Sequence, residues 1–150
     1  MKWIYFVPVF ILLASCGVKD KGAGPNPVTP VSGTPEGYYA TKSKLFLVKP
    51  STLDLKPHEE NTVTYRFVTR DLTPVKLSDY TFRVTSNMPT MPEMGGPWDA
   101  ADVKVLEDGQ LSATYEIYHG HELHVWEFTI EVLSGDKVID TLVYSHLVKE

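Results

Sequence analysis

The most constraining feature of this sequence is an alternation of apolar and polar residues that returns in several short segments. In residues 62–69, Val63, Tyr65 and Phe67 alternate with Thr64 and Arg66. Side chains of a β-strand point alternately to opposite faces of the sheet, so this pattern predicts a strand with one buried face. No sustained stretch shows the 3.6-residue apolar period of an amphipathic helix. The chain is therefore expected to be all-β.

Further strands are predicted along the rest of the chain, separated by turn signals. The turn signals are Asp-Leu-Thr-Pro at 71–74, Glu-Asp-Gly at 107–109 and Ser-Gly-Asp at 134–136. The additional predicted strands are 45–48, 80–85, 103–106, 111–117, 124–132 and 138–148. About seven short strands with turns between them predict an immunoglobulin-like β-sandwich over residues 41–150. The Cys-Trp-Cys pattern of true immunoglobulin domains is absent, so only the architecture is expected.

The first sixteen residues have the features of a lipoprotein leader. Lys2 precedes an apolar run from Trp3 to Ala14. A membrane-spanning helix needs roughly 20 apolar residues, so this shorter run fits a signal peptide. Leu-Ala-Ser-Cys at 13–16 resembles a lipobox, in which the cysteine is lipidated and becomes the first mature residue. We expect a signal peptide at 1–15 and a bilayer anchor at Cys16; an ordinary signal peptide is the alternative.

The segment after the anchor predicts a tether. Residues 16–40 contain Gly-Ala-Gly-Pro-Asn-Pro and Thr-Pro-Val-Ser-Gly-Thr-Pro, which have many chain breakers and little to bury. The anchor uses the single cysteine, so no disulfide is available to the domain. We expect the protein in the cell envelope, and no aspartate after Cys16 favours the periplasmic face of the outer membrane if the source is Gram-negative. The net charge of −5 and the lack of a Lys/Arg-rich run argue against a nucleic-acid partner.

Three of the four methionines lie close together, at Met88, Met91 and Met94. Two prolines in this segment favour polyproline II, which has three residues per turn and would place all three thioethers on one side. Soft, uncharged sulfur donors on an exposed loop suit Cu(I). The alternative is that these methionines plug the open end of a sandwich, because methionine fills irregular gaps well.

Three histidines form a second cluster, at His119, His121 and His124. In an extended chain His119 and His121 point the same way, and imidazole suits Cu(II), Zn(II) or Ni(II). The alternative interpretations are a polar loop and, for His124, the end of the apolar face that carries Trp126. His58 and His146 are isolated and are expected to be structural or solvated. The sequence does not show whether the methionine and histidine clusters meet in space.

Four short motifs carry a resemblance to a known family. They are Asp-Leu-Thr-Pro-Val at 71–75, Asn-Met-Pro-Thr-Met-Pro at 87–92, Asp-Gly-Gln-Leu at 108–111 and Trp-Glu-Phe-Thr-Ile-Glu-Val at 126–132. Together they are similar to a YtkA-like (FixH-like) domain over about residues 44–148. The resemblance implies a small, exported or membrane-anchored immunoglobulin-like domain, associated with copper handling and cytochrome oxidase assembly.

The family resemblance supports the methionines as metal ligands, but it does not extend to the clustered histidines. The family often carries a histidine beside its methionine segment, whereas Gly95 and Gly96 follow Met94 here. Met88, Met91 and Met94 are therefore the residues that the resemblance supports, with His119, His121 and His124 as supplementary ligands from the residue analysis alone.

Three functional hypotheses follow from these observations. The first is a copper-binding lipoprotein that buffers or delivers copper, with Cu(I) favoured, to an envelope or oxidase-assembly partner. The second is a non-catalytic interaction module that holds no metal. An enzyme is not expected, because neither a nucleophile–base pairing nor paired carboxylates stand out.

Overall fold

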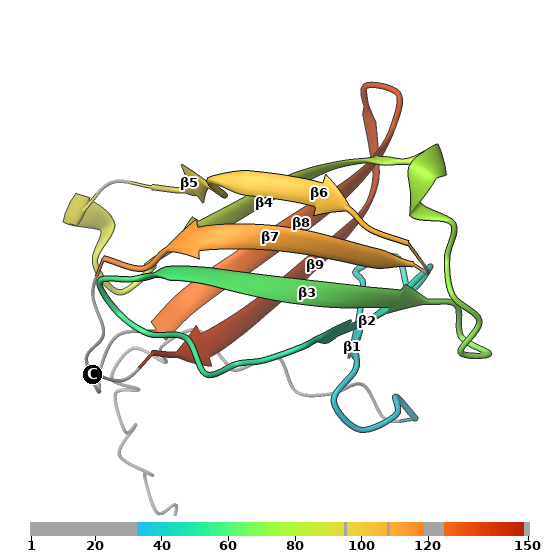
Figure 1. The fold of residues 1–150 in the computed structure, drawn as a ribbon, viewed down its shortest axis with the longest axis horizontal. Helices are drawn as coiled ribbons and strands as arrows, with labels where there is room; N and C mark the ends of the chain where they lie inside the picture. Colours follow the sequence, from blue (N-terminus) through green and yellow to red (C-terminus); the bar gives the residue numbers. More distant parts are fainter. Residues whose placement is uncertain (1–32, 95, 108, 119–124, 149–150) are drawn as a thin grey trace, which may run out of the picture.

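The computed structural model describes residues 33–94, 96–107, 109–118 and 125–148 (Figure 1). These residues form nine strands and two single turns of 3-10 helix. The elements are β1 (Tyr39–Ala40), β2 (Leu47–Pro50), β3 (Glu60–Val68), η1 (Leu77–Asp79), β4 (Thr81–Asn87), η2 (Pro92–Met94), β5 (Trp98–Asp99), β6 (Asp102–Val105), β7 (Gln110–Glu116), β8 (Val125–Ser134) and β9 (Lys137–Leu147). Within the described part of the chain, neither helical turn is long enough to cross a membrane.

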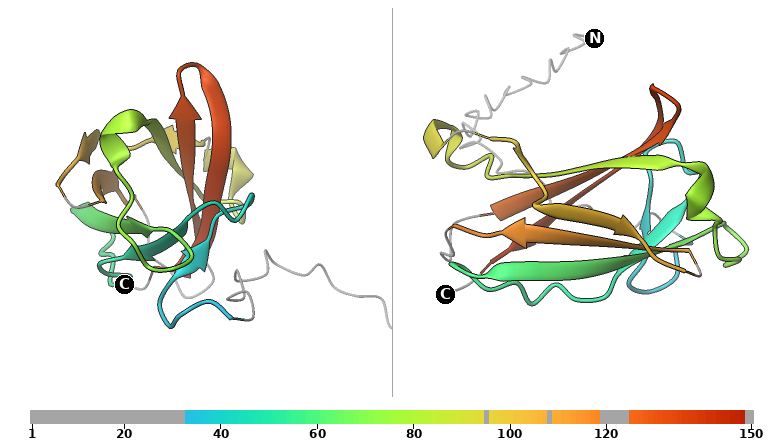
Figure 2. Two further views of the ribbon diagram at one scale, coloured as in Figure 1. Left: turned by 90° about the vertical axis from the view of Figure 1, so that its right-hand side faces the viewer. Right: turned by 45° about the horizontal axis from the view of Figure 1, so that its top comes forward.

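The strands form two antiparallel sheets that pack face to face (Figures 1 and 2). One sheet has the order β1-β2-β3-β7-β6 and the other β5-β4-β8-β9. With β2, β3, β6 and β7 as strands A, B, D and E of an immunoglobulin domain, the first sheet follows the order A-B-E-D. The second follows C-F-G through β4, β8 and β9, with β5 added beside β4. The predicted immunoglobulin-like sandwich is confirmed.

The seven predicted strands correspond to β2, β3, β4 and β6–β9. The two strands not predicted, β1 and β5, have two residues each and are too short to show alternation. β1 pairs with β2, with Tyr39 opposite Val48, so the sheet includes the last two residues of the stretch expected to be linker. The described sandwich therefore begins before Thr41.

The core lies between the sheets and is rich in aromatic rings. The predicted inward faces are buried in β3 (Val63, Tyr65, Phe67), β7 (Leu111, Ala113, Tyr115) and β8 (Trp126, Phe128, Ile130, Val132). At its centre the Tyr65 hydroxyl is hydrogen-bonded to those of Tyr115 (2.7 Å) and Tyr144 (2.6 Å). Burial raises the pKa of all three phenols, so they remain protonated donors. Each buried hydroxyl thereby obtains a partner, as a close-packed interior requires.

A buried carboxylate holds the first turn of the domain against β9. Asp140 is 2% exposed, and its oxygens accept hydrogen bonds from Thr41 Oγ1 (2.5 Å) and from the backbone N–H groups of Ser43 (2.8 Å) and Leu45 (3.2 Å). The Thr141 N–H donates a further bond at 2.8 Å. Asp140 therefore fixes the point where the chain enters the sandwich.

The β6–β7 turn depends on a glycine that no other residue can replace without strain. Gly109 has a φ of +72°, and an added Cβ would lie 3.0 Å from the backbone oxygens of Phe67 and Val75. We expect Gly109→Ala to lower the free energy of unfolding by about 3 kcal/mol, from left-handed strain and backbone overlap together. Urea denaturation monitored by tryptophan fluorescence measures this loss.

Gly135 provides the matched control. It has a φ of +59°, but no atom lies within 4 Å of an added Cβ. Gly135→Ala should therefore lose only the conformational part, about 1 kcal/mol. Equal losses at the two positions would show that close approach of the backbone at Gly109 is not the cause.

Candidate metal centre

The strand register brings both predicted metal-binding clusters to one end of the sandwich. The end of β4 pairs with the start of β8 (Asn87 with Glu127), and the start of β8 pairs with the end of β9 (Val125 with Leu147). In the other sheet, β7 ends at the same side of the molecule, on the left of Figure 1. We call this side the loop end. The methionine segment leaves β4 there, and the segment 119–124 connects β7 to β8 there.

The three clustered histidines lie outside the described residues. The histidine segment, which contains His119, His121 and His124, is flanked by Tyr118 and Val125. Both of these flanking residues are described, and both lie at the loop end. A contact between the sheets fixes this arrangement, because the rings of Tyr118 and Trp98 lie 6.0 Å apart. The topology thus places Tyr118 and Val125, which flank the histidine segment, at the end of the sandwich that carries the methionines.

The methionine segment does not form the predicted polyproline II helix. The Met91 N–H donates to the Met88 carbonyl at 3.0 Å, and the Met94 N–H donates to the Met91 carbonyl at 3.0 Å. These are two consecutive hydrogen-bonded turns, and the second contains η2, a single turn of 3-10 helix. The prediction is wrong because proline fixes only φ near −65°, a value that 3-10 and polyproline II conformations share. The value of ψ, which proline does not set, decides between them.

The three methionines consequently have different environments. Met88 is fully buried in the core, Met91 is partly buried and packs against the core, and Met94 is 38% exposed. Met91 and Met94 are the two ends of the turn that the Met94 N–H closes onto the Met91 carbonyl, so their backbones lie close together. The predicted row of three exposed thioethers is therefore not present. Met88 fills the end of the core, which is the alternative interpretation of the sequence, and Met91 and Met94 remain partly exposed.

Aromatic rings support the chain where it returns from the methionine segment. The indole of Trp98 lies 5.7 Å from that of buried Trp126, measured between ring centroids. At Gly96, with a φ of +110°, an added Cβ would lie 3.0 Å from Asn87 Oδ1 and 3.2 Å from the Trp98 ring. The segment 88–98 is therefore packed closely where it starts and where it ends.

The two isolated histidines also lie at the loop end. His58 is exposed beside the end of β7, where its backbone N–H donates to the Ile117 carbonyl at 2.6 Å. His146 is half-buried on β9, opposite Trp126. Burial lowers the pKa of His146, although a hydrogen bond with the Leu53 backbone and the charge of Asp54 act in the opposite direction. His146 is therefore neutral near pH 7.

This pKa shift has a consequence for stability. Because folding lowers the pKa of His146, the unfolded chain binds its proton more readily, and the stabilisation from the neutral ring is lost as pH falls below about 6.5. We expect the loss of unfolding free energy between pH 7 and pH 5 to be smaller in His146→Gln than in the unsubstituted chain. Urea titrations at both values measure it, and equal losses would contradict the assignment.

Carboxylates and histidines of the described residues do not form a metal site by themselves. In residues 33–118 and 125–148, apart from the gaps at 95 and 108, no three side chains of His, Cys, Asp or Glu converge as a ligand set.

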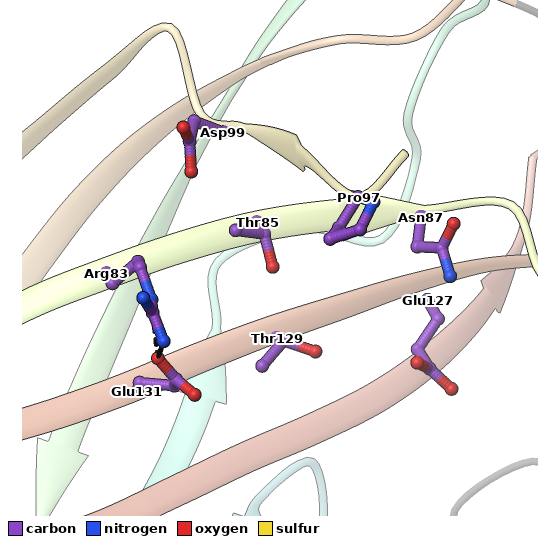
Figure 3. Close-up of a pocket in the computed structure, with 8 residues that line it drawn as sticks. All are labelled: Arg83, Thr85, Asn87, Pro97, Asp99, Glu127, Thr129 and Glu131. Atoms are coloured by element: carbon purple, nitrogen blue, oxygen red, sulfur yellow. Dashed lines mark hydrogen bonds and ion pairs between the residues drawn. The ribbon is translucent and has the colours of Figure 1, made fainter. Parts of the chain in front are cut away.

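A polar groove lies on the outer face of the second sheet, beside the methionine segment (Figure 3). It has a volume of about 440 Å³ and is lined by Arg83, Thr85, Asn87, Pro97, Asp99, Glu127, Thr129 and Glu131. The Arg83 guanidinium donates from Nε to Glu131 Oε2 at 2.6 Å. Asp99 and Glu127 form no ion pair within the described residues, so the groove is net acidic.

The sequence was also compared with protein-family models and curated proteins, and the fold with solved structures, and none of the three comparisons gave a match. The functional assignment consequently depends on the chemistry of the residues and on where the fold places them.

Proposed function

We propose that this protein is a copper-binding lipoprotein of the cell envelope that buffers copper or delivers it to a partner, for example in oxidase assembly. One observation carries the proposal: Met91 and Met94 lie at the same end of the sandwich as the two strands that hold the segment with His119, His121 and His124. The similarity of residues 44–148 to YtkA-like domains supports the same conclusion.

The donor types at the loop end fit Cu(I) better than the harder divalent ions. Met91 and Met94 offer two soft, uncharged sulfurs, and imidazoles 119, 121 and 124 would complete the set. Thioethers have no titratable proton, so these two ligands would keep their affinity at a pH where imidazole is protonated. The bound copper ion would itself be the cargo that the protein passes to a partner.

The position of the tether suits delivery. Leu47 pairs with Val68 at the end of β3 far from the loop end, and the Thr41–Phe46 turn adjoins it. The chain thus enters the sandwich away from the methionine segment. An anchor at Cys16 would hold the domain to the bilayer and leave the loop end available to a partner.

A competition titration tests the proposal. The full chain, purified in detergent, is titrated with Cu(I) in the presence of a chromogenic Cu(I) chelator under reducing, oxygen-free conditions. We expect one equivalent of copper to be withdrawn from the chelator. If the chelator keeps all the copper at every protein concentration, the proposal is wrong.

The acidic groove beside the methionine segment favours a second candidate function, a metal-free interaction module. Its Asp99 and Glu127, which form no ion pair within the described residues, would be complementary to a basic surface on an envelope partner. The effect of Cu(I) on the melting temperature distinguishes the two candidates, because a ligand that binds the folded state must stabilise it. A melting temperature unchanged by Cu(I) would favour the module.

A further inference from the structure

A second, smaller hollow lies between the two sheets, close to the loop end. It has a volume of about 220 Å³ and is lined by Ser86, Trp98, Asp99, Ala101, Glu116 and Tyr118. β4 and β5 contribute one side, with Ser86 paired to Trp98, and the end of β7 contributes the other. We call it the β5–β7 hollow. It shares only Asp99 with the groove of Figure 3 and contains none of the predicted copper ligands.

The hydroxyl of Ser86 is the first sign that the hollow receives a ligand. Ser86 is 3% exposed and lines the hollow, yet its Oγ has no hydrogen-bond partner among the described residues. A buried hydroxyl without a partner destabilises the fold, and such groups are few in native proteins. Alanine would fill this position without that penalty. The polar atom is explained if a ligand provides its partner.

The walls of the hollow are suited to a positive charge. Trp98 and Tyr118 meet edge to face with ring centroids 6.0 Å apart, and the faces of such rings attract cations. Asp99 and Glu116 add two carboxylates. The Tyr118 hydroxyl donates to Glu116 Oε2 at 2.6 Å, which keeps the Glu116 carboxylate beside the ring. The same contact raises the pKa of Tyr118, so its ring stays neutral.

From these features we propose that the β5–β7 hollow binds a primary alkylammonium group. An ammonium group has three N–H donors and no acceptor. Three residues that line the hollow carry acceptors to match them: Ser86 through Oγ, Glu116 through its carboxylate, and Asp99, whose residue lines both this hollow and the groove of Figure 3. The alkyl chain would lie against the rings of Trp98 and Tyr118, which contact each other. The ligand is either a free amine or the side chain of a lysine on a docking partner, and this site is independent of the copper proposal.

The test uses the full chain in detergent, treated with a chelator so that copper plays no part. n-Butylammonium is titrated while tryptophan fluorescence and the melting temperature are followed. We expect saturable binding with a dissociation constant on the order of 1–10 mM, as fits a ligand of five heavy atoms. The uncharged n-pentanol should bind at least tenfold more weakly. Equal effects of the two compounds would overturn the proposal.

Two substitutions locate the site, with one neighbouring substitution as a control. Ser86→Ala and Asp99→Asn should each weaken n-butylammonium binding at least fivefold. Ser86→Ala should leave the melting temperature of the free chain unchanged or raise it, because no hydrogen bond is lost. Thr129→Ala, on β8 in the groove of Figure 3 and not among the residues that line the hollow, should bind as the unsubstituted chain does. Unchanged affinity in Ser86→Ala would show that solvent alone satisfies this hydroxyl, and the proposal would fail.

The same titration with Nα-acetyl-lysine methylamide distinguishes the two sources of the ammonium group. Binding at least as tight as that of n-butylammonium would assign the hollow to a lysine of a partner protein. Binding of n-butylammonium alone would assign it to a free amine. Failure of both ligands would overturn the site while leaving the copper titration unaffected, since neither measurement contains the other's ligand.

Discussion

Replacing Met91 and Met94 together by leucine is expected to weaken Cu(I) binding by about 100-fold or more. Loss of a residue that merely orients a metal ligand already lowers affinity about 10- to 100-fold, so removal of two direct ligands should reach at least the upper value. Leucine keeps the volume and apolar character of methionine, so the fold should tolerate the change. Competition against a Cu(I) chelator measures the affinity, and circular dichroism checks the fold.

Met88 provides a matched control within the same segment. It is fully buried, whereas Met94 is 38% exposed. Met88→Leu should therefore leave Cu(I) affinity unchanged and alter the free energy of unfolding by less than about 1.5 kcal/mol. If Met88→Leu weakens copper binding as much as the double substitution does, the assignment of Met88 to the core alone is wrong.

The second large effect concerns Asp140. Asp140→Ala should lower the free energy of unfolding by about 3 kcal/mol or more, because it leaves the N–H groups of Ser43 and Leu45 without their acceptor and removes the short hydrogen bond of Thr41 Oγ1, which keeps only the Phe46 carbonyl. Each donor left unsatisfied in a buried or half-buried place costs about 1–3 kcal/mol, and water can reach the exposed part of the turn. Equilibrium urea denaturation measures the loss.

Asp102 is the appropriate comparison for Asp140. It is also an aspartate on a strand, but it is exposed and pairs only with Lys104 at 2.5 Å on the surface. Exposed ion pairs contribute about 1 kcal/mol at most. Asp102→Ala should therefore have a small effect. Similar losses in the two variants would show that the hydrogen-bonded turn at Thr41 does not depend on the buried carboxylate.

The main strands could be predicted because their side chains are alternately buried and outward-facing, which gives their sequences a two-residue apolar period. Val63, Tyr65 and Phe67 point into the core, and their neighbours Thr64 and Arg66 face outward. A strand of two residues is too short to show an apolar–polar alternation, and β1 and β5 were therefore not predicted. Asp140 was also missed, since an isolated aspartate in a strand gives no sign that distant backbone groups will surround it.

The residues of the candidate site could be proposed from the sequence, but their geometry could not. The spacing of Met88, Met91 and Met94 indicated a three-residue repeat, and backbone hydrogen bonds join each of these residues to the next. Which of the three is buried depends on how far β4 extends before the turn begins, and side-chain types do not encode that length. The β5–β7 hollow joins residues from three separate segments, so no local sequence pattern indicated it.

Copper X-ray absorption on the Cu(I)-loaded full chain tests most directly whether the loop end is a copper site. We predict sulfur scatterers in the first coordination shell, together with imidazole nitrogen, and loss of the sulfur contribution in the Met91→Leu, Met94→Leu double variant. A first shell of nitrogen and oxygen alone, or a sulfur contribution that survives the double substitution, would contradict the assignment of Met91 and Met94 as copper ligands.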